Sequence, residues 1–171
     1  MPKANPVKED LARIRRELGA LSKMSVHIGI LGEADSEMLT IANVHEYGCT
    51  INVTPKMRAY LHYMGLHLKP DTETINIPER SFIRASFDTG QSELAKIADN
   101  AIGKVINGKK TAKEAMEEIG LLAAQWTQNY INDGYVTPEN SDFTLDRKSQ
   151  STTLVDSGRL VGSITHEVRG G

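Results

Sequence analysis

Two long stretches with helical periodicity, joined by a short polar turn, constrain the fold more than any other feature of this 171-residue chain. In the first, residues 79–106, apolar side chains recur on one face of a helix. A turn at 107–108 follows, and Thr111 with Glu114 has the spacing of a capping box that opens a second helix ending near residue 132. Because both helices have a broad apolar face and the turn is tight, they should pack as an antiparallel pair across a sheet.

The segment TINIPERSFIRASFD predicts how the first long helix is reached. Residues 74–77 alternate polar and apolar, as a half-buried strand does. Pro78 cannot continue a strand ladder, but its fixed φ suits the first turn of a helix, so we expect the helix to start at Glu79. Arg80 and Arg84 would then lie one turn apart, and two neighbouring cations favour an acidic partner, either inside this chain or on another one. Phe82, Ile83, Ser86 and Phe87 would fall together on one face of this helix.

The remaining predicted elements are short. Alternating or β-branched runs predict strands at 25–31, 50–54 and 163–168, and a hairpin in which 66–68 pairs with 74–77. Helical spacing predicts a helix at 37–47 that Gly48 should end, a helix at 56–64 with Tyr60 packed inward, and a short helical turn capped by Asp156.

Residues 1–23 are expected to form an N-terminal helical arm. Asn5 and Pro6 have the order of a helix cap followed by a first-turn proline. The apolar residues of this helix form a narrow stripe that suits a single groove. The stripe could dock on its own domain or on a neighbouring subunit, and its members are Val7, Leu11, Ile14, Leu18 and Leu21.

These elements together predict an α+β fold, in which a small, mainly antiparallel sheet packs against two long antiparallel helices, with an N-terminal helix in addition. We expect residues 24–171 to form a single domain. A polar stretch at about 133–153 shows no sustained period. A segment of this kind inside a compact domain usually has a function or becomes ordered against a partner.

Composition and charge exclude several classes of function. The formal net charge is −2 at pH 7, so no broad positive field attracts nucleic acid, and we expect no specific nucleic-acid ligand. Cys49 is the single cysteine, which leaves no internal disulfide or multi-thiolate metal site and fits a reducing compartment. No apolar run reaches the roughly 20 residues that cross a bilayer, and the first residues lack the apolar core of a secretion signal. We therefore expect no membrane partner and a place inside the cell that makes the chain.

A search for catalytic motifs finds no arrangement typical of an enzyme. The sequence has no glycine-rich nucleotide loop, no HExxH and no GxSxG. The nearest approach to a metal site is His45 beside Glu46, with His62 and His67 downstream. Adjacent residues on a helix point about 100° apart, so His45 and Glu46 should not bind one ion, and the spacing of His62 and His67 gives no reason for them to meet. We expect no enzyme, no cofactor and no metal, with a small metal-dependent hydrolase at these four residues as the alternative.

Charged residues of opposite sign gather in two parts of the sequence. The acidic group is Glu33, Asp35, Glu37 and Glu46, and the basic group is Lys56, Arg58 and Lys69. Opposed patches on one small domain suit head-to-tail self-association, while ordinary solvated faces remain the alternative.

Four motifs, in the same order, resemble the neck proteins of long-tailed bacteriophages, which are described variously as head-tail joining, tail-completion or virion morphogenesis proteins. The motifs are HEYG at 45–48, IPERSFIR at 77–84, TLDRK at 144–148 and LVDSGRLVGSI at 154–164. The resemblance covers about 44–168, most of the chain, and leaves the N-terminal helix outside it.

The resemblance implies a non-enzymatic virion protein that is assembled in the host cytoplasm. It would form a homo-oligomer, expected to be a ring, at the head-tail junction or at the end of the tail. Its partners would be copies of itself, a head-side adaptor or stopper, and tail proteins, with DNA passing through the ring without being read. A prophage-encoded binding module is a further alternative. The candidate assembly-interface residues are His45, Glu46, Tyr47, Lys56, Arg58, Arg80, Arg84, Arg147, Lys148, Asp156 and Arg159.

Overall fold

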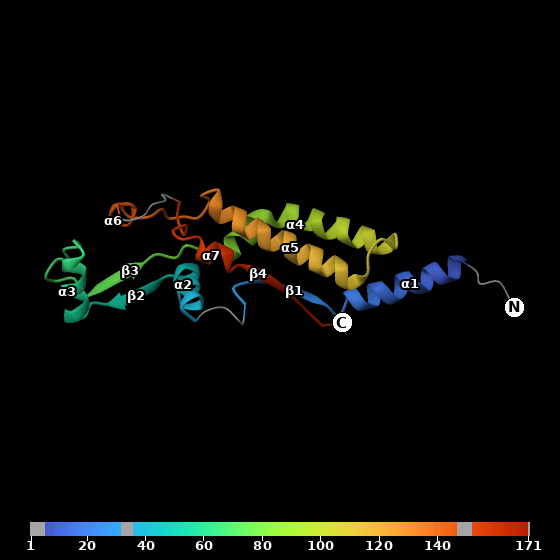
Figure 1. Cartoon of the computed structure of the whole chain (residues 1–171), viewed down its shortest axis with the longest axis horizontal. Coiled ribbons are helices and arrows are strands. Elements are labelled where there is room, and N and C mark those ends of the chain that lie inside the picture. The colour runs from blue at the N-terminus through green and yellow to red at the C-terminus, as the bar shows by residue number, and fades with distance from the viewer. Residues whose placement is uncertain (1–5, 32–35, 147–151, 171) are drawn as a thin grey trace.

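The chain folds into an elongated body with an extension at each end (Figure 1). This computed structural model describes residues 6–31, 36–146 and 152–170. Helices α4 (Ile83–Ile106) and α5 (Ala112–Asn132) form the middle, and helix α1 (Pro6–Leu21) extends from one end (Figure 1). The predicted α+β class is confirmed, with a long helix pair, small antiparallel sheets and an N-terminal helix.

Helices α4 and α5 pack against each other along their length (Figure 1). Thr111 Oγ1 accepts a hydrogen bond from the Glu114 N–H at 3.3 Å, and Glu114 Oε2 accepts one from the Thr111 N–H at 2.8 Å, so the predicted capping box is confirmed. Gly90 lies within α4, and a Cβ there would collide with the Trp126 ring of α5. Trp126 Nε1 donates to the Ser86 carbonyl at 2.8 Å. The indole therefore joins the two helices where the glycine leaves room for it.

One antiparallel ribbon packs against this helix pair. Strand β1 (Ser25–Gly29) pairs with β4 (Thr165–Arg169), with Val26 opposite Val168, and both strands contact α5. Both match the predicted strands to within two residues at either end.

A second ribbon lies apart from the first, so the expected sheet is two separate two-stranded sheets. Strand β2 (Cys49–Asn52) pairs with β3 (Thr74–Ile77), and Cys49 lies opposite Ile77. The predicted hairpin between 66–68 and β3 is wrong, because β2 takes the place beside β3.

The second ribbon carries helix α3 (Pro55–Tyr63) at its far end (Figure 1). Thr54 Oγ1 caps this helix by accepting from the backbone of its first turn. The Arg58 guanidinium donates to the carbonyls of Lys69 at 2.7 Å and Thr72 at 2.6 Å. These two bonds stabilise the turn that leads from α3 back to β3. We call residues 49–77 the distal arm.

Helix α2 (Ser36–Tyr47) ends at Gly48, as predicted. Gly48 has φ +70°, a conformation that favours glycine. A Cβ at this position would lie 2.8 Å from the Glu79 nitrogen and 2.9 Å from the Ile77 oxygen. The absent side chain therefore lets the chain after β3 pass directly beneath the end of α2.

Replacing Gly48 with alanine should lower the free energy of unfolding by about 2–4 kcal/mol, because the new Cβ meets backbone atoms and the residue keeps a left-handed φ. Denaturant unfolding measures this change. Gly103→Ala is the matched control, since nothing lies within 4 Å of a Cβ there and alanine in a helix interior stabilises by about 0.5–1 kcal/mol. Equal stability of the two variants would contradict the close approach.

The predicted start of the first long helix, at Glu79 directly after the proline, is wrong. Helix α4 begins at Ile83. The residues before it cross beneath α2, where the Arg80 N–H donates to the His45 carbonyl at 2.7 Å. Phe82 precedes the helix and is fully buried. Phe87, which the helical spacing placed on the same face as Phe82, is 55% exposed.

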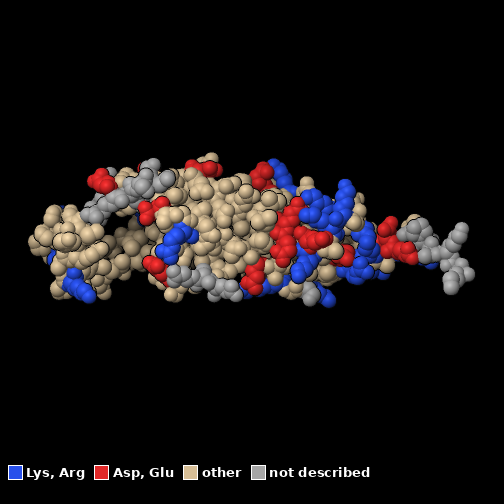
Figure 2. Space-filling model, viewed as in Figure 1, with Lys and Arg blue, Asp and Glu red and all other residues tan. Residues whose placement is uncertain are grey.

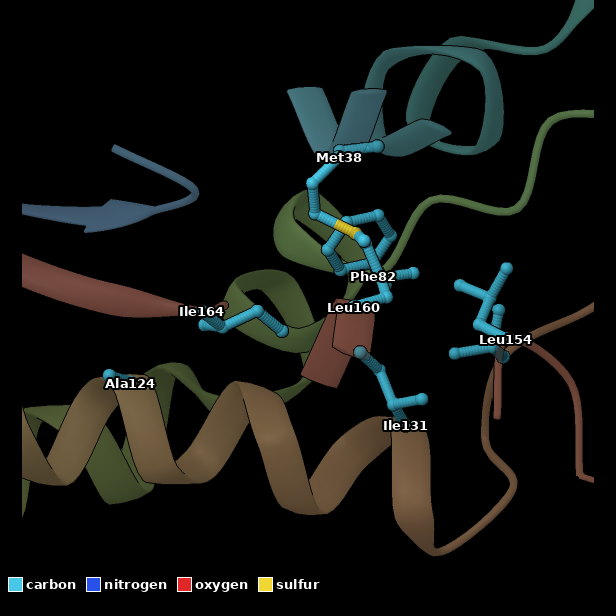
Figure 3. Packing of buried hydrophobic residues seen from close by; sticks show 9 residues of the cluster. Met38, Phe82, Ala124, Ile131, Leu154, Leu160 and Ile164 are labelled. Carbon is cyan, nitrogen blue, oxygen red and sulfur yellow. The ribbon is translucent and has the colours of Figure 1, made fainter. Parts of the chain in front are cut away.

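The main core lies where α2, α4, α5 and the C-terminal segment converge. Figure 3 shows Phe82 beneath Met38, with Ile131 and Leu160 nearby. The buried members of this cluster are Met38, Ala42, Phe82, Ala124, Ile131, Val136, Leu154, Leu160 and Ile164. A smaller cluster of Ala101, Val105 and Ala115 lies near the turn between the long helices.

The polar segment expected at 133–153 contains more structure than its sequence predicts. Helix α6 (Asp142–Leu145) forms a single turn within it. Val136 is 1% exposed and belongs to the main core, which attaches the segment to the body.

Asp156 does not cap the short helix that follows it, so this prediction is wrong. Helix α7 (Arg159–Gly162) has Gly158 at its N-cap position, without a side-chain cap. Gly158 adopts φ 76° there.

Helix α1 attaches to the body through polar contacts at the turn between the long helices. Arg13 donates to the carbonyls of Val105 and Ile106, both at 2.9 Å, at the C-terminal end of α4. Glu17 accepts from the Ala112 N–H at 2.9 Å, at the N-terminal end of α5. That hydrogen bond and the neighbouring arginine lower the pKa of Glu17. Both side chains thus satisfy helix-terminal groups that have no partner within their own helices.

Candidate functional site

Glu46, in the last turn of α2, is the most heavily bonded side chain of the predicted interface set. It is 5% exposed. Its carboxylate accepts from the N–H groups of Phe82, Ile83 and Arg84 at 2.8, 3.0 and 3.1 Å and from Ser81 Oγ at 2.8 Å. Burial would raise its pKa, but the three backbone hydrogen bonds and the one from the serine hold the pKa of Glu46 below its ordinary value of 4.5. Glu46 therefore caps the N-terminus of α4 from another helix.

Arg84 has its acidic partners inside this chain. Its Nε donates to Glu46 at 3.0 Å and its Nη2 to Glu79 at 2.8 Å. Its guanidinium also lies 4.8 Å from the centre of the Tyr47 ring. Of the two partner locations left open by the sequence, the structure places the partner of Arg84 within the subunit.

Arg80 has different partners from Arg84 and is 9% exposed. Its Nε donates to the Pro138 carbonyl at 2.8 Å and its Nη2 to the Glu139 carbonyl at 2.9 Å. Burial lowers the pKa of this guanidinium. Arg80 thus holds the polar segment against the body and is not presented to a partner.

Replacing Arg80 with methionine should release the polar segment at Glu139. The loss of two charge-assisted hydrogen bonds should cost about 1–3 kcal/mol and speed cleavage after Glu139 by a glutamate-specific protease. Arg159→Met is the control, because Arg159 is exposed and pairs with Glu37 at 3.6 Å. Unchanged cleavage in the Arg80 variant would contradict this role.

The histidines of the alternative metal site do not converge with Glu46. His62 and His67, whose spacing did not predict a contact, lie together in the distal arm with their Nδ1 atoms 2.7 Å apart. His45 lies beside Glu46 on α2, but that carboxylate is occupied by the start of α4. Among the residues that the structure describes, no group of three or more His, Cys, Asp or Glu side chains is placed to hold a metal ion.

The remaining predicted interface residues are scattered. Tyr47 is 63% exposed and Lys56 is exposed on α3, while Arg58 bonds to carbonyls of its own arm. Asp156 is exposed, and Arg147 and Lys148 lie outside the described residues.

Of the two charge groups inferred from the sequence, Glu46 and Arg58 have partners within the subunit. Glu46 is buried, Arg58 serves the distal arm internally, and Glu33 and Asp35 lie outside the described residues. On the face shown in Figure 2, charges of both signs gather around α1 and the turn between the long helices, whereas the middle of the body carries few.

Large apolar and aromatic side chains are exposed at both ends of the molecule. On α1, Val7, Leu11 and Leu18 are 64%, 60% and 42% exposed, and we call these three residues the arm stripe. On the distal arm, Tyr60 and Tyr63 are 60% and 85% exposed, so the expectation that Tyr60 packs inward is wrong. Such surfaces on a protein are typical of sites that contact another macromolecule. The stripe was visible as helical spacing, but no sequence signal distinguished the exposed tyrosines from buried ones.

No helix in the described part of the chain combines the length and apolar character needed to cross a membrane. Comparison of the chain with family models, curated proteins and solved structures finds no significant match.

Proposed function

We propose that this chain is a structural subunit of the bacteriophage head-tail junction, where copies of it assemble, as a ring, to join tail to head. One observation carries the proposal furthest: the ionic groups at the centre of the fold bond within the subunit, while large apolar and aromatic side chains are exposed on its surface, including at both ends. A subunit of this kind has surface left for neighbours at both ends. The four ordered motifs that resemble phage neck proteins support the same function.

Two of those motifs coincide with the internal framework. Glu46 of the HEYG motif caps the helix that begins in the IPERSFIR motif, and Arg84 of the second motif returns a bond to Glu46. The resemblance therefore concerns residues that shape the subunit. The arm stripe and the distal arm lie largely outside these two motifs, and these exposed ends would supply the contacts with neighbouring proteins.

Deleting the coding sequence from the phage or prophage that carries it tests the proposal. Electron microscopy of the resulting particles should show filled heads and free tails that are not joined. Complementation with the wild-type chain, or with Glu79→Ala, should restore joined particles, whereas the destabilised Glu46→Ala variant should not. Normal infectious particles made without the chain would refute the proposed function.

A further inference from the structure

The middle of the body carries an apolar groove between β1, α4 and α5. Its volume is about 430 Å³. We call it the central groove, and its apolar lining includes Val26, Ile28, Ile83, Phe87, Leu94 and Ala123. Phe87 is 55% exposed on its wall, and the charged side chains of Arg84 and Asp88 also line it. The groove has the size and apolar character of a site that receives side chains of another segment.

The arm stripe on α1 cannot reach the central groove of its own subunit. Arg13 fixes α1 to the carbonyls of Val105 and Ile106, at the far end of α4 from Phe87. Phe87 precedes Val105 by 18 residues, which corresponds to about 27 Å along the helix. From that attachment α1 extends away from the body (Figure 1). The stripe and the groove are therefore two separate apolar surfaces on one chain.

We propose that the arm stripe of one copy docks in the central groove of the next copy. The two surfaces match in chemistry, since one presents aliphatic side chains on a helix and the other an apolar channel. They also match in charge: Lys8 and Arg15 flank one side of the stripe at helical spacing, and Asp88 lines the groove, whose other charged residue, Arg84, is already paired with Glu46 and Glu79. Because the surfaces differ, the contact is head-to-tail, and it gives a ring when its rotation closes. The inference rests on the proposed function in assuming that copies of the chain assemble.

Two single variants and their mixture test this contact. Leu11→Asp disables the stripe and leaves the groove intact, whereas Phe87→Asp disables the groove and leaves the stripe intact. Both residues are exposed in the subunit, so neither change should unfold it, which circular dichroism checks. Leu121→Asp is the matched control, because Leu121 is equally exposed, at 60%, on α5 outside both surfaces.

Sedimentation at rising concentration should show association of the wild-type chain and of Leu121→Asp. Each of the other variants alone should associate about 30-fold more weakly, as expected when an interface hot spot is lost. An equimolar mixture of Leu11→Asp and Phe87→Asp should form a dimer that grows no further, because it contains one intact contact and two disabled ends.

Four results would overturn the inference: a wild-type chain that stays monomeric at the highest attainable concentration, a Phe87→Asp variant that associates like wild type, a mixture that stays monomeric, or an equal loss in Leu121→Asp. These failures are distinguishable from failure of the proposed function. Assembly through other surfaces would defeat the docking contact and leave the junction role standing. Joined particles in the deletion strain would defeat the junction role and leave the docking contact standing.

Discussion

Replacing Glu46 with alanine should lower the free energy of unfolding by about 2–4 kcal/mol, because it removes the buried carboxylate that caps α4 and leaves buried N–H groups without an acceptor. The change leaves the N–H groups of Phe82, Ile83 and Arg84 without their acceptor and removes the bond to the Arg84 guanidinium. Denaturant unfolding at pH 7 measures the loss. Glu79→Ala is the control, because Glu79 also bonds to Arg84 but its side chain is 54% exposed, and it should cost less than about 1 kcal/mol.

The same variant should also show how stability depends on pH. Because folding lowers the pKa of Glu46, its carboxylate stabilises the folded state at neutral pH, and this contribution is lost as pH falls below the ordinary value of 4.5 through the lower folded-state value. The stability difference between wild type and Glu46→Ala should therefore shrink as the solution is acidified below that value. A difference that stays constant during acidification would contradict the role of the ionised carboxylate.

Phe82→Ala should be comparably damaging, with a loss of about 3–5 kcal/mol. Phe82 is fully buried in the main core, where Figure 3 shows it beneath Met38. Removing the ring leaves a cavity at the point where α2 crosses the start of α4. Unfolding by denaturant, followed by circular dichroism, measures the change.

Phe87→Ala offers a control of identical chemistry, because Phe87 is 55% exposed. It should cost less than about 1 kcal/mol, as surface substitutions generally do. Similar losses for the two phenylalanines would show that the core is not centred on Phe82.

The contrast between these phenylalanines shows where sequence reasoning succeeds and where it stops. Local signals were sufficient for the capping box at Thr111, the end of α2 at Gly48 and the strand at the C-terminus. Each of these depends on residues a few positions apart, so periodicity and turn chemistry can reveal it.

The start of α4 depends on a residue that is distant in sequence. Glu46 accepts a hydrogen bond from the Phe82 N–H although the two residues are 36 positions apart, and no local sequence pattern predicts that contact. The prediction that the helix starts directly after Pro78 therefore placed the start of α4 too early and put both phenylalanines on one helical face. The same limit applies to the hairpin expected at 66–68, because the partner that β3 takes is β2.

The candidate site was predictable only in part. The sequence identified Arg80 and Arg84 as side chains in need of partners, but not that backbone carbonyls would satisfy one and Glu46 the other. The apolar stripe on α1 was recognisable by its spacing. The central groove was not, because β1, α4 and α5 contribute to it from separate parts of the chain.

A reconstruction of the intact particle tests the central claim most directly, namely that this chain is an assembled component of the head-tail junction. The account predicts a ring of copies where tail meets head, each with its exposed ends in contact with neighbouring proteins. A reconstruction of complete, joined particles in which the chain occupies no position at the junction or at the end of the tail would contradict it.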